Sequence, residues 1–545
     1  MDVAAAVIEI LKREGTEYLI GYPANPLFEA GAEAGLRPII VRQERTGVHM
    51  ADALSRVSSG QKIGVAVTQF GPGIENAFGA VAQAYSESVP LIVLPAGYAR
   101  PQANVSPRFS ALLNFQQITK NIEQLHRPED VVRAMRRAFT QVRNGRPRPV
   151  LVEIPYDMFH DELPGELEYQ PAMRRLSAPD PSDVDRVAGA LIEAAHPVIY
   201  AGQGVHYAQA WDALRELAEA LEAPVTTSLE GKSAFSETHR LSLGSGGRAL
   251  PGPVYHFVQN ADLIFGVGCS FAATNYGIQF PPGKTYIQAT LDPADINRDL
   301  EVDDALVGDA RLTLEMLAEA VKDRLNGAPR GRADTVAEEI ERLEGEWQSA
   351  WRHKTTFDGT PLSPYRVIRD LHATVDVPNT IITHDAGSPR DQLSPFWVCE
   401  TPLSYLGWGK TTQLGYGLGL AMGAKLAQPE KLCINVWGDA AIGMTGMDFE
   451  TAVRAGIPIT SVLFSNGAMA IELPTMEAAT SRYRATDITG NYSEMARAFG
   501  GYGERITEPG EIVPAIQRAM EQNANGVPAL LEFITAQETE YSVFP

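Results

Sequence analysis

The 545-residue sequence contains only three cysteines, Cys269, Cys399 and Cys433, and they lie far apart. Their spacing matches neither a zinc motif nor a redox motif, which argues against a disulfide framework and suits a reducing compartment. Basic residues are also scarce, with 46 lysines and arginines against 67 aspartates and glutamates and a formal net charge of −21. Nucleic acids and anionic membranes bind clustered basic residues, so we expect neither as a partner.

Long apolar runs are missing as well. No run approaches the roughly 20 apolar residues that a membrane-spanning helix needs. The N-terminal stretch MDVAAAVIEILKREG has an acidic second residue and the spacing of an amphipathic helix, so it lacks the basic start of a signal peptide. These absences predict a cytoplasmic protein. A content of 44% hydrophobic and 21% charged residues is typical of a globular chain, and the length suits three domains.

Strand-like and helix-like segments alternate along almost the whole chain. In the first part, LRPIIVRQ, KIGVAVTQ and PLIVLPA read as buried parallel strands, and ERTGVHMADALSRVSSG and IENAFGAVAQAYS read as the helices between them. This βαβαβ order predicts a parallel sheet with right-handed crossovers. Two further blocks repeat the pattern, so we predict an α/β fold with three parallel-sheet domains, at residues 1–160, 184–325 and 360–545.

Two segments between these blocks read as connectors. The stretch HDELPGELEYQPAMRRLSAPDPSD is polar and proline-rich and has no apolar periodicity, which predicts a linker at about 160–183. The stretch ADTVAEEIERLEGEWQSAWRHKTT predicts a charged surface helix that leads into the third block.

The stretch NVWGDAAIGM places Asp439 directly after an apolar run, where a buried strand gives way to a helix. The next strand, PITSVLF, is followed by Asn466, so both side chains should leave the carboxyl edge of one sheet, where α/β proteins bind ligands. Their oxygens, with the backbone carbonyl of Ala468, suit Mg²⁺ and leave positions open for a diphosphate. The alternative is a helix-capping aspartate and an asparagine in a turn before Gly467.

WGDAAIGM and FSNGAMA together resemble the motif, GDG followed one crossover later by Asn, that holds thiamin diphosphate in the superfamily of acetolactate synthase, benzoylformate decarboxylase and oxalyl-CoA decarboxylase. GYPANPLFEA, VRQERTGVHMADALSR, VTQFGPGIENAF and NFQQITK look like the pyrimidine-binding domain of acetolactate synthases, in that order. HDAGSPRDQ and TTQLGYGLGLAMGAKLA resemble the start of the diphosphate-binding domain, so the resemblance spans nearly the whole chain. Ala440 replaces the second glycine of the motif and Ser465 the first asparagine of its usual pair, which indicates a divergent member.

The resemblance implies thiamin diphosphate and Mg²⁺ as cofactors and assigns residues to both. It implies that Asp439, Asn466 and Ala468 bind the metal. The residues it places against the cofactor are Pro23, Gly71, Gly73, Asn76, Gly387, Leu414, Gly438, Asp439, Ala440, Ala441, Asn466, Ala468 and Met469. Leu414 precedes a glycine-rich turn, where relatives place a bulky residue that bends the cofactor; a core leucine is the alternative.

The resemblance also assigns the catalytic role to Glu44. In the family, a glutamate at this place hydrogen-bonds N1′ of the cofactor, so that the 4′ nitrogen can take the proton from C2 and leave a carbanion that attacks a carbonyl. A carboxyl group suits this role because burial raises its pKa. Without the resemblance, Glu44 is simply an acid that the helix dipole favours at the start of a helix.

The substrate side of the resemblance is weaker. Phe115 and Gln116 fall where acetolactate synthases have a Phe-Gln-Glu stretch near the reacting centre, so they are implied to line the substrate, with Gln117 in place of the acid. In the middle block, YAGQGV and FGVGCSF mark turns where FAD or ADP binds in some relatives. Residues 269–273 depart from the usual Arg-Phe-Asp-Asp stretch, so a vestigial site filled by its own side chains is the alternative.

The sequence therefore predicts an enzyme dependent on thiamin diphosphate and Mg²⁺ that cleaves and forms C–C bonds of a 2-oxo acid, with acetolactate synthase-like carboligation first. A non-ligating 2-oxo-acid decarboxylase or a hydrolase that cleaves a cyclic or acyclic diketone is the alternative, because the third block lacks the tryptophan expected after Asn466. A catalytically silent regulatory paralogue is a third reading, against which Glu44 speaks. In the family the blocks of Glu44 and Asp439 embrace one cofactor from different chains, which implies a homodimer or a dimer of dimers with shared sites.

Overall fold

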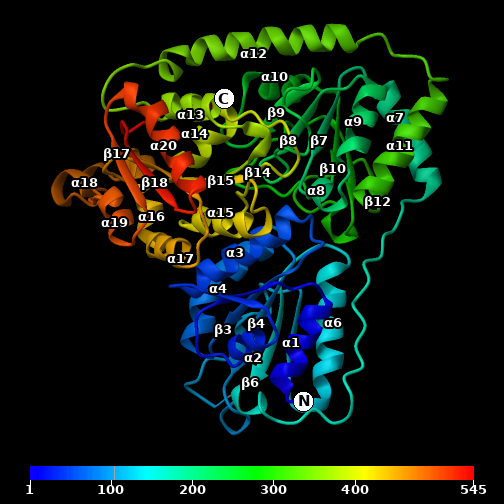
Figure 1. The fold of residues 1–545 in the computed structure, drawn as a ribbon. Helices are drawn as coiled ribbons and strands as arrows, with labels where there is room; N and C mark the ends of the chain where they lie inside the picture. The colour runs from blue at the N-terminus through cyan, green and yellow to red at the C-terminus, as the bar shows by residue number, and fades with distance from the viewer. Residues whose placement is uncertain (104) are drawn as a thin grey trace.

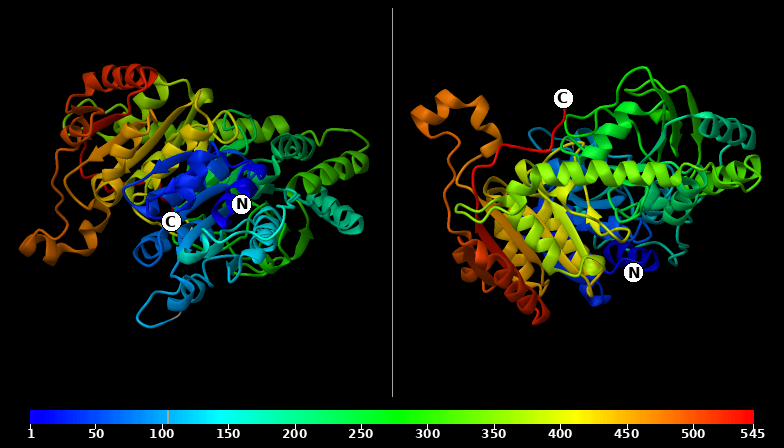
Figure 2. Two further views of the ribbon diagram at one scale, coloured as in Figure 1. Left: turned by 60° about the horizontal axis from the view of Figure 1, so that its bottom comes forward. Right: turned by 90° about the horizontal axis from the view of Figure 1, so that it is seen from above.

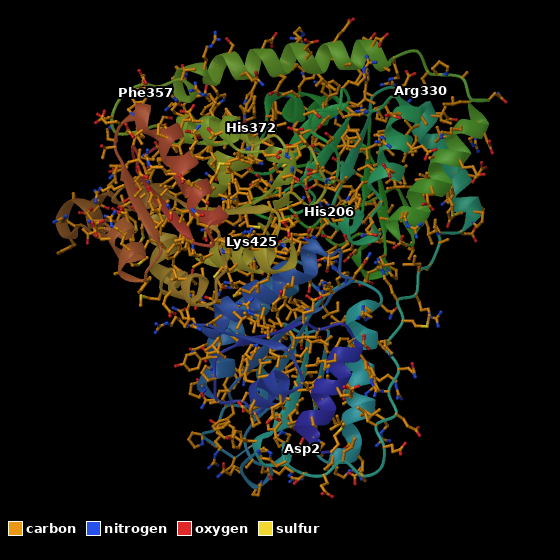
Figure 3. The ribbon with its side chains drawn as sticks, viewed as in Figure 1. Asp2, His206, Arg330, Phe357, His372 and Lys425 are labelled. Carbon is orange, nitrogen blue, oxygen red and sulfur yellow. The ribbon has the colours of Figure 1, made fainter. Side chains whose placement is uncertain are left out.

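The computed structural model describes residues 1–103 and 105–545 and contains three domains, each built on a six-stranded parallel sheet. The first domain lies at the bottom of Figure 1, the central domain at the upper right and the third domain at the upper left. Helices cover both faces of the sheets, and side chains fill the space between the layers (Figure 3). The predicted α/β class with three parallel sheets is confirmed.

In the first domain the sheet has the order β2-β1-β3-β4-β6-β5. Its strands are β1 (Tyr18–Gly21), β2 (Arg37–Ile40), β3 (Gly64–Thr68), β4 (Leu91–Gly97), β5 (Asn121–Gln124) and β6 (Val150–Pro155). Its helices are α1 (Val3–Arg13), α2 (Leu27–Glu33), α3 (Glu44–Val57), α4 (Pro72–Ser86), α5 (Ala111–Asn114) and α6 (Val131–Arg143), with short 3₁₀ turns η1 (Arg100–Gln102), η2 (Pro128–Asp130) and η3 (Tyr156–Met158).

The central sheet has the order β12-β11-β10-β7-β8-β9. Its strands are β7 (Pro197–Ala201), β8 (Val225–Ser228), β9 (Ser242–Gly246), β10 (Leu263–Val267), β11 (Thr285–Thr290) and β12 (Asp304–Val307). Its helices are α7 (Pro181–Glu193), α8 (Gly204–Ala208), α9 (Trp211–Leu221), α10 (Gly252–Asn260) and α11 (Ala310–Arg324), with η4 (Pro293–Asp295). The predicted connector helix is α12 (Ala333–Thr355), which spans the top of the molecule in Figure 1.

The third sheet has the order β14-β13-β15-β16-β18-β17. Its strands are β13 (Thr380–His384), β14 (Tyr405–Leu406), β15 (Leu432–Gly438), β16 (Thr460–Ser465), β17 (Tyr502–Ile506) and β18 (Ala529–Ile534). Its helices are α13 (Pro364–Thr374), α14 (Ser388–Phe396), α15 (Tyr416–Ala427), α16 (Asp439–Thr445), α17 (Phe449–Arg454), α18 (Glu477–Tyr483), α19 (Tyr492–Ala498) and α20 (Ile512–Ala524), with η5 (Val377–Asn379), η6 (Gly446–Asp448), η7 (Ala470–Thr475) and η8 (Pro509–Glu511). Figure 2 shows α18 projecting from the body of this domain.

Two local predictions differ from the structure. The single helix expected over MTGMDFETAVRAG is divided into α16, the turn η6 and α17, because Gly446 ends α16 and Asp448 begins the next helical turn. The strand β9 was not predicted, since its sequence SLGSG lacks apolar alternation and contains two glycines.

Helices α3 and α15 cross at the contact between the first and third domains (Figure 1). A Cβ atom on Gly419 would lie 2.4 Å from the Cβ of His49, and one on Gly423 would lie 2.2 Å from the Met50 carbonyl oxygen. These glycines of α15 therefore let the two helices approach closely. In the described residues, no helix has the length and apolar character to cross a membrane.

Candidate active site

Three predicted site segments of the first domain meet at the carboxyl edge of its sheet. Pro23 follows β1, Glu44 follows β2, and Gly71 and Gly73 follow β3. Because β1 lies between β2 and β3, the sheet order brings these loops side by side. This edge is where parallel α/β sheets bind ligands.

The carboxyl group of Glu44 faces the start of α4 and is largely buried. Its Oε2 accepts a hydrogen bond from Nδ2 of Asn76 at 3.2 Å. A Cβ atom on Gly73 would lie 3.3 Å from Oε1, so the glycine leaves free the space beside the carboxyl group. Burial raises the pKa of Glu44, and the negative charge of Asp448 also raises it, while the hydrogen bond from Asn76 lowers it. The protonated form of this carboxyl group is therefore favoured more than in a solvent-exposed glutamate.

The third domain repeats this arrangement on neighbouring strands β13, β15 and β16. Gly387 follows β13, Gly438 ends β15 and is followed by Asp439, and Asn466 follows β16. The parallel register pairs Gly438 with Phe464, so the two strand ends lie level with each other. The predicted neighbours Ala440 and Ala441 lie in the first turn of α16, and Ala468 and Met469 lie in the loop after Asn466.

The Asp439 carboxylate joins the ends of β15 and β16. Its Oδ2 accepts hydrogen bonds from the amides of Asn466 at 3.1 Å and Gly467 at 2.8 Å, and Oδ1 accepts one from Ala440 at 3.1 Å. Oδ1 of Asn466 in turn accepts from the amide of Ala468 at 3.0 Å. The structure therefore brings together all three predicted metal ligands.

Asp439 is only 3% exposed, and within the described chain no basic side chain forms an ion pair with it. Burial raises its pKa, while the amides of Gly467 and Asn466 lower it. An ionised carboxylate in such surroundings is costly without a cation, so the pocket suits a metal ion. The predicted donor set contains only one carboxylate. It therefore does not form a cluster of three His, Cys, Asp or Glu side chains, and residues 1–103 and 105–545 contain no such cluster that could hold a metal ion.

The loop before α14 is shaped to admit a ligand at the helix N-terminus. Gly387 has φ +83° and ψ −148°, a conformation that L side chains rarely adopt, and a Cβ atom added there would meet nothing within 4 Å. The N-termini of α14 and α16 therefore lie at the ends of the adjacent strands β13 and β15 and offer backbone amides beside Asp439. This arrangement fits a metal-bound diphosphate.

Asp385 is a site-supporting residue that the sequence analysis missed. It is fully buried at the end of β13; its Oδ1 accepts from the amide of Gly415 at 2.9 Å, and its Oδ2 from that of Gly417 at 3.0 Å. Burial raises the pKa of Asp385 to about 7. Through these bonds it holds the turn that carries Leu414, which is half-buried against the contact with the first domain. The sequence signal that could have identified Asp385 is an acid directly after the strand-like stretch NTIITH, since Asp439 follows its strand in the same way.

The two predicted substrate-lining residues occupy different environments. Phe115 is fully buried and packs edge-to-face on Phe78, with ring centroids 5.1 Å apart. It belongs to a core cluster of the first domain. Gln116 is exposed. Contact of either residue with a substrate stays a prediction.

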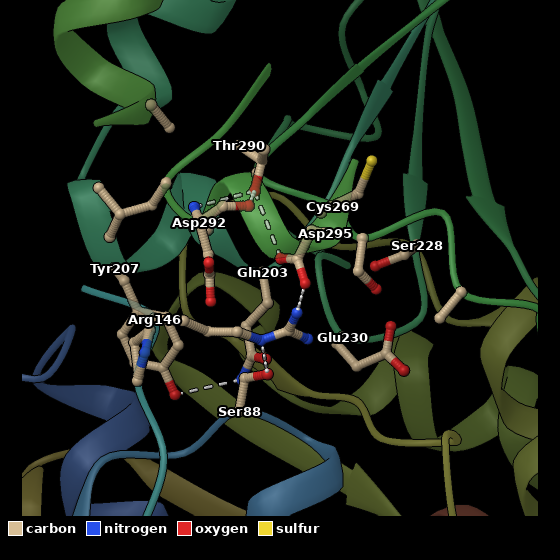
Figure 4. Close-up of a pocket in the computed structure, with 18 of the residues that line it drawn as sticks. Ser88, Arg146, Gln203, Tyr207, Ser228, Glu230, Cys269, Thr290, Asp292 and Asp295 are labelled. Atoms are coloured by element: carbon tan, nitrogen blue, oxygen red, sulfur yellow. Dashed lines mark hydrogen bonds and ion pairs between the residues drawn. The ribbon is translucent and has the colours of Figure 1, made fainter. Parts of the chain in front are cut away.

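A further pocket lies where the central domain meets the other two (Figure 4). Its free volume is about 140 Å³, below the roughly 300–1,000 Å³ of typical ligand pockets. Arg146 extends into it, pairs with Asp295 and donates from Nε to Ser88 at 2.9 Å. Glu230 also points into the space in Figure 4. The pair of Arg146 and Asp295 therefore occupies part of the space in which the resemblance offers FAD or ADP, and binding of either stays a prediction.

The first-domain and third-domain parts of the predicted cofactor site approach each other through the segment before Glu44 and the helix α16. Nε2 of Gln43, next to Glu44, donates to the carbonyl oxygen of Met444 at 3.2 Å, near the C-terminal end of α16. Asp439 begins the same helix, whose seven residues span about 10 Å. Glu44 thus lies beyond the far end of α16 from the metal ligands, and in the described residues no hydrogen bond or ion pair joins it to Asp439.

Three family models match the chain in order. They are the thiamine pyrophosphate enzyme N-terminal TPP binding domain at residues 1–125, the central domain at 184–317 and the C-terminal TPP binding domain at 385–533. The first covers Glu44 and the third covers Asp439 and Asn466.

The chain is also similar over its whole length to curated large subunits. It is 29% identical to a probable acetolactate synthase large subunit of Methanocaldococcus jannaschii, over 98% of this chain and 92% of the relative. It is 27% identical to the acetolactate synthase isozyme 3 large subunit of Escherichia coli, over 96% and 92%. The acetolactate synthase large subunit of Corynebacterium glutamicum is 28% identical, over 99% and 88%.

Proposed function

We infer the function from the premise that this chain belongs to the thiamine pyrophosphate enzymes and is acetolactate synthase-like. We propose that this chain would hold thiamin diphosphate through Mg²⁺ and that, with the cofactor bound, it decarboxylates one 2-oxo acid with release of CO₂ and joins the remaining fragment to a second 2-oxo acid. The observation that carries this proposal is Asp439, a buried carboxylate with no basic partner in the described chain, beside Asn466 on the adjacent strand.

When bound, the cofactor supplies an acidic C–H and an electron sink for the carbon–carbon bond change. The protein residues do the rest. Asp439, Asn466 and the Ala468 carbonyl hold the metal and, through it, the diphosphate. Glu44 holds a proton on its carboxyl group for the pyrimidine, and Asn76 orients that group by donating to Oε2. Leu414 stands between the two ends of the cofactor and favours its bent form.

The purified protein with thiamin diphosphate and Mg²⁺ should release CO₂ from at least one 2-oxo acid in a panel that includes pyruvate and 2-oxobutanoate. A 2-alkyl-2-hydroxy-3-oxo acid, with a 2-methyl group when pyruvate is the acceptor and a 2-ethyl group when 2-oxobutanoate is, should form in step with CO₂, because ligation consumes the fragment that decarboxylation leaves. Coupled CO₂ detection and NMR of the products measure both. Release of CO₂ with only free aldehyde would favour the decarboxylase alternative, which the segment IELPTMEAATSRYR supports through its lack of tryptophan. Turnover of a diketone alone would favour the hydrolase.

A silent regulatory paralogue is disfavoured by Glu44. A protein that only binds the cofactor needs the metal site, but it does not need a largely buried carboxyl group with a raised pKa on the other domain. We propose no flavin for the central pocket, because Arg146 and Asp295 occupy part of it.

We also propose that two chains share each active site. The resemblance implies this arrangement, because in the family the blocks that carry Glu44 and Asp439 embrace one cofactor from different chains, and here the two residues lie in different domains. Large apolar side chains close to both halves are exposed, which is typical of a surface that another subunit covers. They are Tyr22, Phe78, Met444, Met447 and Met469.

Mixing two inactive variants tests this assembly. Glu44→Gln and Asp439→Ala subunits, each inactive alone, should regain about a quarter of wild-type activity after co-assembly, because half of the dimers are mixed and one of their two sites carries neither change. Native mass spectrometry counts the mixed dimers in the same sample. Mixed dimers without activity would show that each chain builds its own site.

A further inference from the structure

Asp448, in the third domain, contacts the N-terminus of α3 in the first domain. Its Oδ1 accepts hydrogen bonds from the amide of Arg42 at 2.6 Å and from the hydroxyl of Thr451 at 2.9 Å. The side chain is fully buried, and its Oδ2 has no hydrogen-bond partner in the described part of the chain. Since α3 begins at Glu44, two residues after Arg42, the bond holds the backbone that carries the proposed catalytic glutamate.

Other contacts join the same two segments at the protein surface. Nε of Arg42 lies 2.8 Å from Oε2 of Glu450, and Nη2 of Arg454 donates to the carbonyl oxygen of Ile40 at 2.6 Å. These exposed contacts are worth little individually, because water screens them. Asp448 differs from them because its carboxylate is buried and accepts a hydrogen bond from a backbone amide, so its removal deprives the partly buried Arg42 amide of this partner.

The charge of Asp448 also acts on Glu44. Burial raises the pKa of Glu44, and the negative charge of Asp448 raises it too, against the hydrogen bond from Asn76. From α4 the polar group that faces Glu44 is Asn76. Arg45, the residue after Glu44, is positively charged, and its charge acts on Asp385. Near Asp448, the positive charge of Arg42 is paired with the negative charge of Glu450, so the two charges offset each other.

We propose that Asp448 is a positioning residue for Glu44: through the Arg42 amide it fixes the start of α3, and it places a buried carboxylate next to the segment that carries the Glu44 carboxyl group. The proposal rests on the role of Glu44 proposed above. Asp448 itself touches neither the metal ligands nor the space beside Gly73, and its contacts are with the first turn of α3 and with α17.

Two substitutions separate its two effects. Asp448→Asn removes the charge and keeps an oxygen that can accept from the Arg42 amide, whereas Asp448→Ala removes both. Glu450→Gln is the matched control, because it removes a negative charge from the same contact between domains without touching the α3 backbone. Asp448→Glu tests rescue, since it restores the charge. Circular dichroism and size-exclusion chromatography confirm that each variant is folded.

The charge effect is measured in the cofactor-free protein. Infrared titration follows the protonated carboxyl stretch, and the Glu44 band is identified by its loss in Glu44→Gln. We expect the Glu44 midpoint to move to lower pH in Asp448→Asn, to return toward the wild-type value in Asp448→Glu, and to stay unchanged in Glu450→Gln. A midpoint that is the same in Asp448→Asn and wild type overturns the proposal, as does an equal shift in Glu450→Gln.

The positioning effect is measured by hydrogen exchange of the peptide at 42–48. Loss of the bond to the Arg42 amide in Asp448→Ala should speed its exchange about tenfold, with little change in Asp448→Asn. Exchange at the wild-type rate in Asp448→Ala would overturn the proposal that Asp448 fixes the start of α3. Both measurements are made without cofactor, so they test the role of Asp448 independently of the proposed function. If the proposed function is wrong, the C2 proton of bound cofactor would instead exchange at the wild-type rate in Glu44→Gln.

Discussion

Replacement of Glu44 by glutamine is expected to slow exchange of the cofactor C2 proton by about two to four orders of magnitude, the usual contribution of a positioned acid or base. The change removes the titrating proton from a group that is buried, has a raised pKa and is oriented by Asn76, while the amide keeps the size of the side chain. Hydrogen–deuterium exchange at C2, quenched in acid and read by NMR, measures the rate. Cofactor affinity should change little, because the metal ligands lie in the other domain.

The matched control is Glu29→Gln, on an exposed face of α2 in the same domain, which should exchange at the wild-type rate. Equal exchange rates in Glu44→Gln and wild type would contradict the catalytic role of Glu44. Such a result would favour the alternative of a catalytically silent regulatory paralogue, which binds the cofactor through the metal site but does not activate it.

Replacement of Asp439 by alanine should weaken binding of thiamin diphosphate by at least about 100-fold, since changes to residues that only support metal ligands already cost 10–100-fold. The variant loses the buried carboxylate that ties the end of β15 to the loop after β16. Calorimetry of cofactor binding with and without Mg²⁺ measures the loss, and the dependence on Mg²⁺ should disappear with it.

Asp334→Ala provides the control for that experiment, because Asp334 is an exposed aspartate of α12 whose side chain is 86% accessible. It should bind the cofactor as the wild type does. Undiminished, Mg²⁺-dependent binding in folded Asp439→Ala protein would refute the metal assignment.

The sequence was sufficient for the features that follow from strand periodicity. Asp439 and Asn466 each come directly after an apolar run, and parallel strands of one sheet end at the same edge, so their proximity could be predicted and is confirmed. Glu44 and Gly73 follow the same rule in the first domain. The short strand β14 and the glycine-containing β9 carry no such pattern, so only the fold reveals them.

Contacts between domains could not be predicted, because they join residues 322 to 406 positions apart in the examples that follow. Asp448 accepts from the Arg42 amide, and Oε1 of Glu87 accepts from the amides of Gly409 and Lys410 at 3.1 and 2.8 Å. Each acid looks like an ordinary surface residue of a helix in the sequence. Burial at the contact changes its chemistry and raises the pKa of Glu87 to about 7.

Phe115 is a residue for which the sequence resemblance implies a role but the structure shows a place in the core. The family resemblance implies a place against the substrate, but the side chain is fully buried on Phe78 in the first-domain core. Burial is the ordinary outcome for a phenylalanine, since hiding its ring from water stabilises the fold by about 2 kcal/mol. Contact of Phe115 with a substrate therefore stays a prediction of the resemblance, while the structure shows the ring packed in the core.

The central claim, addition of the cofactor carbanion to a 2-oxo acid, is tested most directly by the cofactor itself. The protein is incubated with thiamin diphosphate, Mg²⁺ and the 2-oxo acid of the panel that it turns over fastest, then quenched in acid so that ¹H NMR resolves free and C2-substituted cofactor. The account predicts C2 adducts in the wild type and in Glu29→Gln, and none above background in Glu44→Gln. Turnover of the 2-oxo acid with no C2 adduct at any time, or adducts at the wild-type level in Glu44→Gln, would contradict it.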